Sequence, residues 1–237
     1  MNQNKVAVVI VAAGSGKRMD LGGKNKVYLD LGGKTVLARS IAAFESHLMV
    51  GEIVVVVRED EIDYCKEYVL NRESFQKVKS VVPGGTERSN SVMAGLMQIS
   101  TSFEYVLIHD GARPFVSEET ISKVIEGVFL HGAAITGVPV TDTIKRMNRK
   151  FVKETLLRKE LYRVQTPQAF RLQEIQSLLG KSIEKGESET DEAVLIERQG
   201  KKVFIVDGKY DNIKITTYED FVLAEAILKI RKEQETP

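Results

Sequence analysis

Short apolar runs alternate with segments of helical periodicity along this chain, and no other feature of the sequence constrains the fold as strongly. Four runs rich in valine and isoleucine cover residues 5–12, 52–57, 78–82 and 105–109. Continuous runs of this kind are typical of strands buried on both faces of a parallel sheet. Residues 35–48 and 91–99 carry apolar side chains at the spacing of a helix. The order predicts an α/β fold, a three-layer helix–sheet–helix sandwich around a mostly parallel, Rossmann-like sheet.

The second half of the sequence continues this pattern. Residues 133–140 and 201–207 are predicted as further strands of the sheet, and 217–234 as an amphipathic helix with a threonine cap. The 237 residues, 43% of them hydrophobic, suffice for the core of one large α/β domain. Because no low-complexity linker or internal repeat is visible, we predict a single domain over 1–237.

Residues 141–165 interrupt the alternation of predicted strands and helices and are rich in lysine and arginine. Two candidate strands, 143–147 and 151–156, flank a polar Asn-Arg-Lys turn, which predicts a hairpin. One interpretation is a solvated charged face. The other is a projecting β-arm that pairs with a second subunit, since exposed strands tend to be covered.

Composition excludes several classes of partner. The formal net charge is +1, so bulk charge recruits neither nucleic acid nor a membrane. Cys65 is the single cysteine and lies in a predicted helix, 61–69, so we expect a buried structural thiol with no disulfide or cysteine-based zinc site. The first residues do not form a secretory signal, and no run approaches the ~20 apolar residues of a membrane span. We therefore expect a soluble, cytoplasmic protein.

A glycine-rich turn follows the first predicted strand, in the sequence VIVAAGSGKRM at residues 9–19. In a P-loop alignment, Val11 stands where the first glycine belongs and Arg18 where the magnesium-binding hydroxyl belongs. A dinucleotide fingerprint fits Gly14 and Gly16 but requires a third glycine where Met19 stands. Neither template matches. Glycines here still allow the backbone to approach a phosphate closely.

The loop and the basic segment GGKNKVYL behind it resemble the nucleotidyltransferase signature of the sugar-phosphate pyrophosphorylase type. Four more segments narrow the resemblance: GGTERSNSV at 84–92, HDGARPFV at 109–116, TPQAF at 166–170 and DNIKIT at 211–216. Together they resemble the 2-C-methyl-D-erythritol 4-phosphate cytidylyltransferase family over essentially the whole chain. The family's usual Pro-Lys-Gln reads here as Asn25-Lys26-Val27, which retains the lysine.

The resemblance implies a reaction in which the acceptor phosphate attacks the α-phosphorus of CTP. The products are 4-diphosphocytidyl-2-C-methyl-D-erythritol and pyrophosphate, in the non-mevalonate route to isoprenoid precursors. A phosphate monoester has a second pKa of about 6, so the nucleophile is already anionic and no general base is needed. We therefore expect no catalytic role for His47, His109 or His131. Fixed positive charge should supply most of the acceleration.

The resemblance also implies site residues. The expected catalytic cations are Arg18, Lys26, Arg158 and Lys214. The expected nucleotide-binding residues are Ala13, Gly14, Ser15, Gly16, Lys17, Gly85, Thr86, Arg88, Ser91 and Ala112. The expected substrate-binding residues are Asp110, Arg113, Thr143, Arg158, Thr166 and Lys214. Asp110 is also the expected ligand of Mg²⁺, beside triphosphate oxygens. The alternative is that Asp110 only caps its loop and places Arg113.

The arm has a role in this scheme. Thr143 and Arg158 are implied to reach the acceptor site of a neighbouring subunit, which makes the enzyme a homodimer through residues 141–165. Two other functions stay open at this stage. Ribitol-5-phosphate cytidylyltransferase shares the fold and the chemistry. A nucleotide sensor without turnover is disfavoured, because mere binding would not require Arg18, Lys26, Asp110 and Lys214 together.

Overall fold

A computed structural model describes residues 5–14, 25–187, 189 and 191–235. Its centre is a seven-stranded sheet in the order β11-β7-β10-β6-β1-β4-β5. The strands of this sheet are β1 (Val6–Val11), β4 (Val50–Val57), β5 (Val78–Pro83), β6 (Tyr105–Asp110), β7 (Ala133–Pro139), β10 (Tyr162–Arg171) and β11 (Phe204–Asp207). All six strands expected from apolar runs are present.

The sheet is mostly parallel, as predicted. Strand β1 pairs in parallel with β4 and β6, β4 pairs with β5, and β11 pairs with β7. Only β10 runs antiparallel, between β6 and β7. The apolar runs did not reveal β10, because polar residues and Pro167 interrupt it. Proline removes a ladder hydrogen bond, so a Pro-containing segment does not read as a central strand.

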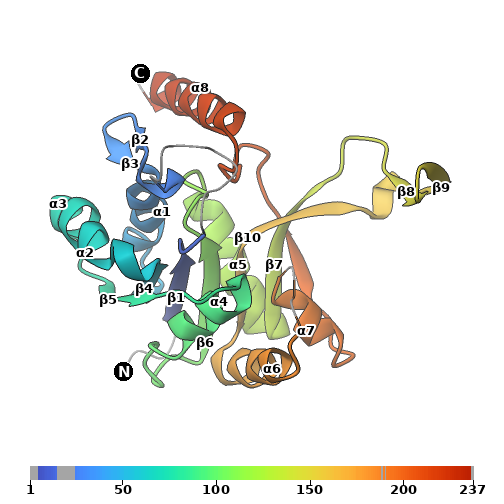
Figure 1. The fold of residues 1–237 in the computed structure, drawn as a ribbon, viewed down its shortest axis with the longest axis horizontal. Coiled ribbons are helices and arrows are strands. Elements are labelled where there is room, and N and C mark those ends of the chain that lie inside the picture. Colours follow the sequence, from blue (N-terminus) through green and yellow to red (C-terminus); the bar gives the residue numbers. More distant parts are fainter. Residues whose placement is uncertain (1–4, 15–24, 188, 190, 236–237) are drawn as a thin grey trace.

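Helices cover both faces of this sheet, and the two faces of β1 show how (Figure 1). Val8 and Ile10 pack into one apolar cluster, whereas Ala7 and Val9 pack into the other. The first cluster lies under α1 (Val36–Glu45) and α5 (Glu118–His131). The second lies under α4 (Arg88–Leu96), α6 (Leu172–Glu184) and α7 (Ala193–Glu197). The three-layer prediction is confirmed.

Two details differ from the sequence prediction. Strand β5 is an edge strand whose residues are half-buried or exposed, because it has a neighbour only in β4. The predicted helix around Cys65 is divided into η3 (Glu59–Glu61), α2 (Ile62–Cys65), the π-helical η4 (Lys66–Leu70) and α3 (Asn71–Glu73). Cys65 itself is buried and free, as predicted.

A small third cluster joins the C-terminal helix to the body. Helix α8 (Tyr218–Glu235) packs through Ala224 against Leu31 of the β2–β3 hairpin (Asp30–Leu31 and Lys34–Thr35). The predicted threonine cap is present, since Thr217 Oγ1 accepts a hydrogen bond from the Asp220 N–H at 3.4 Å. Among the described residues, no helix is long and apolar enough to cross a membrane.

The predicted hairpin extends from the body on two long connections (Figure 1). Strands β8 (Lys145–Asn148) and β9 (Phe151–Thr155) pair antiparallel across a turn in which Arg149 has a φ of 53°. Every residue of both strands is exposed. The described hairpin residues belong to none of the three apolar clusters, and the hairpin is joined to the body through β7 and β10, between which it is inserted in the sequence.

Candidate active site

A cavity of about 630 Å³ opens where β1, β4, β5 and β6 end. Carboxyl ends of neighbouring parallel strands are the usual ligand position in such sheets. Ten of the expected residues line it: Ala13, Gly14, Lys26, Gly85, Thr86, Arg88, Ser91, Asp110, Ala112 and Lys214. The expected Ser15, Gly16, Lys17 and Arg18 lie outside the described residues.

Glycines allow two loops to meet at the wall of this cavity. A Cβ on Gly84 would lie 2.3 Å from the Ala13 Cβ, so no larger residue fits there. Gly85 N–H donates to the Ser91 hydroxyl at 3.1 Å, and that hydroxyl donates to the Glu87 carbonyl at 3.2 Å. Ser91 therefore fixes the turn after β5, rather than simply facing the cavity.

Asp110 is the last residue of β6, and three cationic side chains lie next to its carboxylate. Its Oδ2 lies 3.0 Å from Arg113 Nε and 3.1 Å from Lys214 Nζ, and its Oδ1 lies 3.9 Å from Arg88 Nε. Burial by itself would raise the pKa of this carboxyl, but Lys214, Arg113 and Arg88 outweigh it and hold the pKa below its usual range. Asp110 is therefore ionised at neutral pH.

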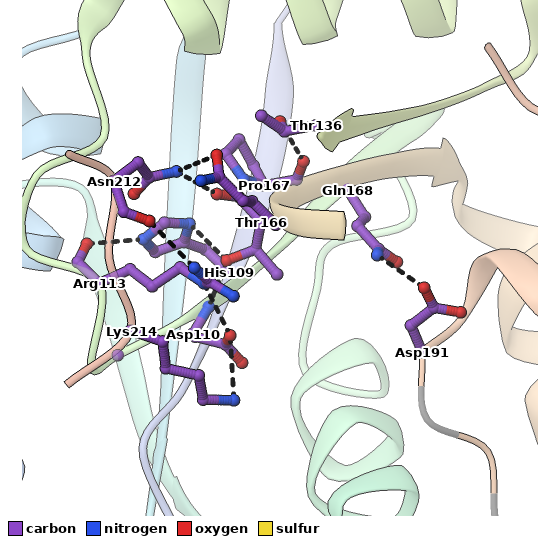
Figure 2. A network of polar contacts seen from close by, with 12 residues as sticks. His109, Asp110, Arg113, Thr136, Thr166, Pro167, Gln168, Asp191, Asn212 and Lys214 are labelled. Atoms are coloured by element: carbon purple, nitrogen blue, oxygen red, sulfur yellow. Dashed lines mark hydrogen bonds and ion pairs between the residues drawn. The ribbon is translucent and has the colours of Figure 1, made fainter. Parts of the chain in front are cut away.

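A closed ring of hydrogen bonds holds the backbone of Asp110 (Figure 2). The Asp110 N–H donates to the Thr166 hydroxyl at 3.0 Å, and Thr166 Oγ1 lies 3.1 Å from His109 Nδ1. His109 Nε2 lies 3.1 Å from the Arg113 carbonyl, and Arg113 N–H returns to the Asp110 carbonyl at 3.0 Å. A carbonyl only accepts, so Nε2 carries the proton and Nδ1 accepts from Thr166.

This ring gives His109 a structural role. Its side chain is fully buried, and burial lowers its pKa to about 4, so the imidazole is neutral. Thr166 is 4% exposed, and its hydroxyl accepts from the Asp110 N–H and donates to His109 Nδ1. The expected contact of Thr166 with substrate stays a prediction. In the structure its hydroxyl contacts the backbone of Asp110.

Asn212 connects the last expected segment to the same ring (Figure 2). Its Nδ2 donates to the Thr166 carbonyl at 3.0 Å, and its own carbonyl accepts from Arg113 Nη1 at 3.0 Å. Lys214 lies two residues further on, so these bonds bring its ammonium to Asp110.

Comparison with known proteins identifies the architecture. The model of the IspD family, described as 2-C-methyl-D-erythritol 4-phosphate cytidylyltransferase, matches residues 6–230. Relatives of that name from Alkaliphilus metalliredigens and Halalkalibacterium halodurans are 45% and 47% identical, and each match covers 94% or more of the chain and 96% of the relative. The crystal structure of 4-diphosphocytidyl-2C-methyl-D-erythritol synthase from Anaerococcus prevotii superposes with a TM-score of 0.85 at 34% identity, covering 95% of this chain and 96% of that one.

The chain belongs to the IspD family. It is therefore a CTP-dependent cytidylyltransferase, which confirms the expected enzyme class and leaves the ribitol phosphate alternative without support.

The arm residues of this IspD chain lie apart from its cavity. Thr143 and Arg158 do not line it, and Arg158 Nη1 donates to the Thr141 carbonyl at 2.8 Å on the arm itself. Arg113 also stays out of the lining and reaches the cavity through Asp110. The described residues that were expected in the site but do not line the cavity are therefore of two kinds: Arg113 and Thr166 contact Asp110 from behind the lining, and Thr143 and Arg158 lie on the arm.

Two residues of the site were missed from the sequence. Glu192 is 2% exposed and lies 2.5 Å from Arg88 Nη1, although 104 residues separate them. Burial raises the pKa of the Glu192 carboxyl, against the effect of Arg88. Asn25 is 3% exposed and caps the 3-10 helix η2 (Lys26–Tyr28) that begins with Lys26. No periodicity or motif signals such long-range partners.

Proposed function

We propose that this cavity binds CTP and joins its cytidylyl group to the phosphate of 2-C-methyl-D-erythritol 4-phosphate. The observation that carries the proposal is the convergence of Arg88, Arg113 and Lys214 on Asp110 at the cavity rim. Fixed cations at the end of a strand suit two phosphorylated reactants, whose mutual repulsion is the main barrier to their reaction.

The nucleotide occupies the end of the cavity formed by β1 and β5 in this proposal. Gly14 and Gly85 are exposed there, and Ala13 is half-buried between them and the core. Their main-chain groups, together with Thr86 and Ser91, would contact cytosine and ribose. We propose that main-chain groups close this end of the cavity around a small base, which would favour a pyrimidine over a purine.

Lys26 is assigned to the transferred phosphorus. It lines the cavity and is only 9% exposed, so its ammonium acts in a partly dehydrated setting where charge interactions are strong. Together with Arg18, whose role rests on the family resemblance, it would stabilise the charge on the pentacoordinate phosphorus. Lys214 would hold the acceptor phosphate in line for attack, with Arg113 fixing Asp110 beside it.

The arrangement around Asp110 fits a magnesium ion. Its Oδ2 takes both short contacts with cations, whereas its Oδ1 lies 3.9 Å from Arg88 Nε. The part of the chain that the structure describes offers no group of three or more acidic, histidine or cysteine side chains that could hold a metal. Magnesium often takes one carboxylate and completes its shell with phosphate oxygens and water. When bound, it would neutralise charge on the triphosphate and on the leaving pyrophosphate.

The arm supports a homodimer in which each subunit completes the other's acceptor site. Apolar side chains are exposed along it, with Phe151 at 80%, Val152 at 57% and Leu157 at 55%. Such a patch on a projecting hairpin fits pairing with a second copy of the chain. Arg158 and Thr143 would then reach the partner's acceptor phosphate. We also propose a cytoplasmic enzyme, where a free buried thiol stays reduced.

The direct test is a matrix of nucleotides and acceptors, with pyrophosphate release as the measurement. CTP with 2-C-methyl-D-erythritol 4-phosphate and Mg²⁺ should give by far the highest rate. Comparable release with ribitol 5-phosphate, or with UTP, would contradict the proposed specificity.

A second experiment tests the shared site. An Arg158→Ala chain and an Arg18→Ala chain, each nearly inactive, should regain partial activity when mixed, because one hybrid site keeps both arginines. No recovery after demonstrated subunit exchange would remove the assignment of Arg158 to the partner's site.

A further inference from the structure

Asn25 directly precedes Lys26, and its side chain is nearly excluded from solvent. Its Nδ2 donates to the Ala12 carbonyl at 3.3 Å and to Glu61 Oε2 at 3.0 Å. Its Oδ1 accepts from the Val27 N–H at 3.3 Å. An amide has two N–H donors and one oxygen, so every polar group of this side chain is engaged.

The three partners of Asn25 belong to separate parts of the fold. Ala12 directly follows β1 and lines the cavity. Glu61 ends η3, which follows β4, and lies 36 residues further along the chain. Val27 lies within η2, so its bond to Asn25 caps the helical turn that starts at Lys26. One side chain thus joins the end of the first strand, the start of the next crossover and the backbone around Lys26.

Glu61, which accepts the hydrogen bond from Asn25, is itself paired with Arg58. Its Oε1 lies 3.8 Å from Arg58 Nε, and its side chain is 12% exposed. Arg58 lines the same cavity as Lys26. The contacts of Asn25 and Glu61 therefore link two lining residues of the cavity, Ala12 and Arg58.

We propose that Asn25 is a positioning residue for Lys26, acting by fixing the backbone from which the lysine side chain enters the cavity. Lysine has four rotatable side-chain bonds, so the place of its ammonium depends on where its Cα is held. A displacement of about 1 Å at a reacting group can cost up to about 10²-fold in rate. The inference rests on the proposed role of Lys26 at the transferred phosphorus.

The experiment is a double-mutant cycle in the full-length enzyme, with kcat and KM for CTP measured for wild type, Asn25→Ala, Lys26→Ala and the double variant. Asn25→Ala should lower kcat about tenfold with a change in KM below about threefold. In the Lys26→Ala background the same substitution should change kcat by less than about twofold, because no ammonium is left to position. A substitution that merely loosens the fold would lower kcat equally in both backgrounds.

The outcomes separate this inference from the function on which it rests. Loss of activity in Lys26→Ala combined with additive effects would overturn the positioning role and leave the proposed function intact. Full activity in Lys26→Ala would refute the proposed role of Lys26, and the role of Asn25 with it. Wild-type kcat in Asn25→Ala would overturn the inference alone.

Glu61 provides a second route if Asn25→Ala fails to fold. Glu61→Gln keeps an oxygen that can accept from Asn25, whereas Glu61→Ala removes it. Kinetic rescue by glutamine, with kcat close to wild type and a severalfold loss only in the alanine variant, supports the inference. Equal losses in both variants contradict it, since the charge of Glu61 would then matter rather than its bond to Asn25.

Discussion

The surroundings of Asp110 and the β8–β9 hairpin use the same kinds of charged residue in opposite ways. Asp110 is 6% exposed, and its three cations come from the turn after β6, from α4 and from the segment before α8. On the hairpin, Arg146 pairs with Glu154 at 2.5 Å, but the two side chains are 57% and 44% exposed. The ion cluster around Asp110 is buried within one chain. The ion pair on the hairpin is exposed to solvent, and only another molecule could cover it.

This difference decides how each region should respond to substitution. Removing one member of a buried, hydrogen-bonded ion cluster leaves the other charges uncompensated, which is costly. An exposed ion pair contributes little, since water and salt screen it. Substitutions near Asp110 should therefore affect catalysis and folding, whereas substitutions on the hairpin should affect assembly.

The largest effect is expected from Asp110→Asn. The variant should lose about 10³-fold in kcat, because the proposed magnesium ligand is removed and Lys214 and Arg113 lose their counter-charge. Pyrophosphate release at saturating CTP and acceptor is the measurement. Asp207→Asn is the matched control, since Asp207 also ends a strand, β11, but is exposed. A loss of less than about tenfold in Asp110→Asn would place the chemistry elsewhere.

The position of Asp110 was predictable from sequence, because a continuous apolar run ends directly before it. The bonds that hold it were not. Thr166 reaches the Asp110 backbone across 56 residues, and Glu192 reaches Arg88 across 104. Such pairs depend on how β10 and α7 pack, and β10 itself was hidden by Pro167. Strand ends could therefore be predicted from local periodicity, whereas the network behind them could not.

The next effect concerns the hairpin. Phe151→Asp places a charge on its most exposed apolar side chain and should convert the proposed dimer into a monomer. Sedimentation equilibrium should then give a mass near 26.5 kDa. Activity should fall by about 10²-fold, because Arg158 no longer reaches a partner's site. An unchanged mass and unchanged activity would show that the hairpin does not mediate assembly.

A stability effect of intermediate size follows from His109. Burial lowers its pKa to about 4 from an ordinary value of 6.5, so between these values the unfolded chain binds a proton that the folded chain does not. Stability is therefore lost as pH falls through this window. The contribution to the free energy of unfolding should drop by about 2 kcal/mol between about pH 7 and pH 5.

Urea unfolding of the wild type and of His109→Gln at the two pH values checks this. The glutamine does not titrate, so most of the pH dependence should disappear. The pH dependence of the free energy of unfolding that remains should come in part from His47, whose pKa is also lowered by burial. If the free energy of unfolding of His109→Gln changed with pH as much as that of the wild type, another group would be the cause of the pH dependence.

The smallest effect sharpens the comparison between the two regions. Arg146→Ala, made in the monomeric Phe151→Asp background, removes the ion pair with Glu154 while the hairpin is solvated on all sides. The free energy of unfolding should change by less than about 0.5 kcal/mol, measured by urea titration at low salt. A change above about 1 kcal/mol would mean that the hairpin ion pair is shielded from water within a single chain. The contrast with the buried cluster around Asp110 would then fail, because both charge groups would belong to the folded body of the enzyme.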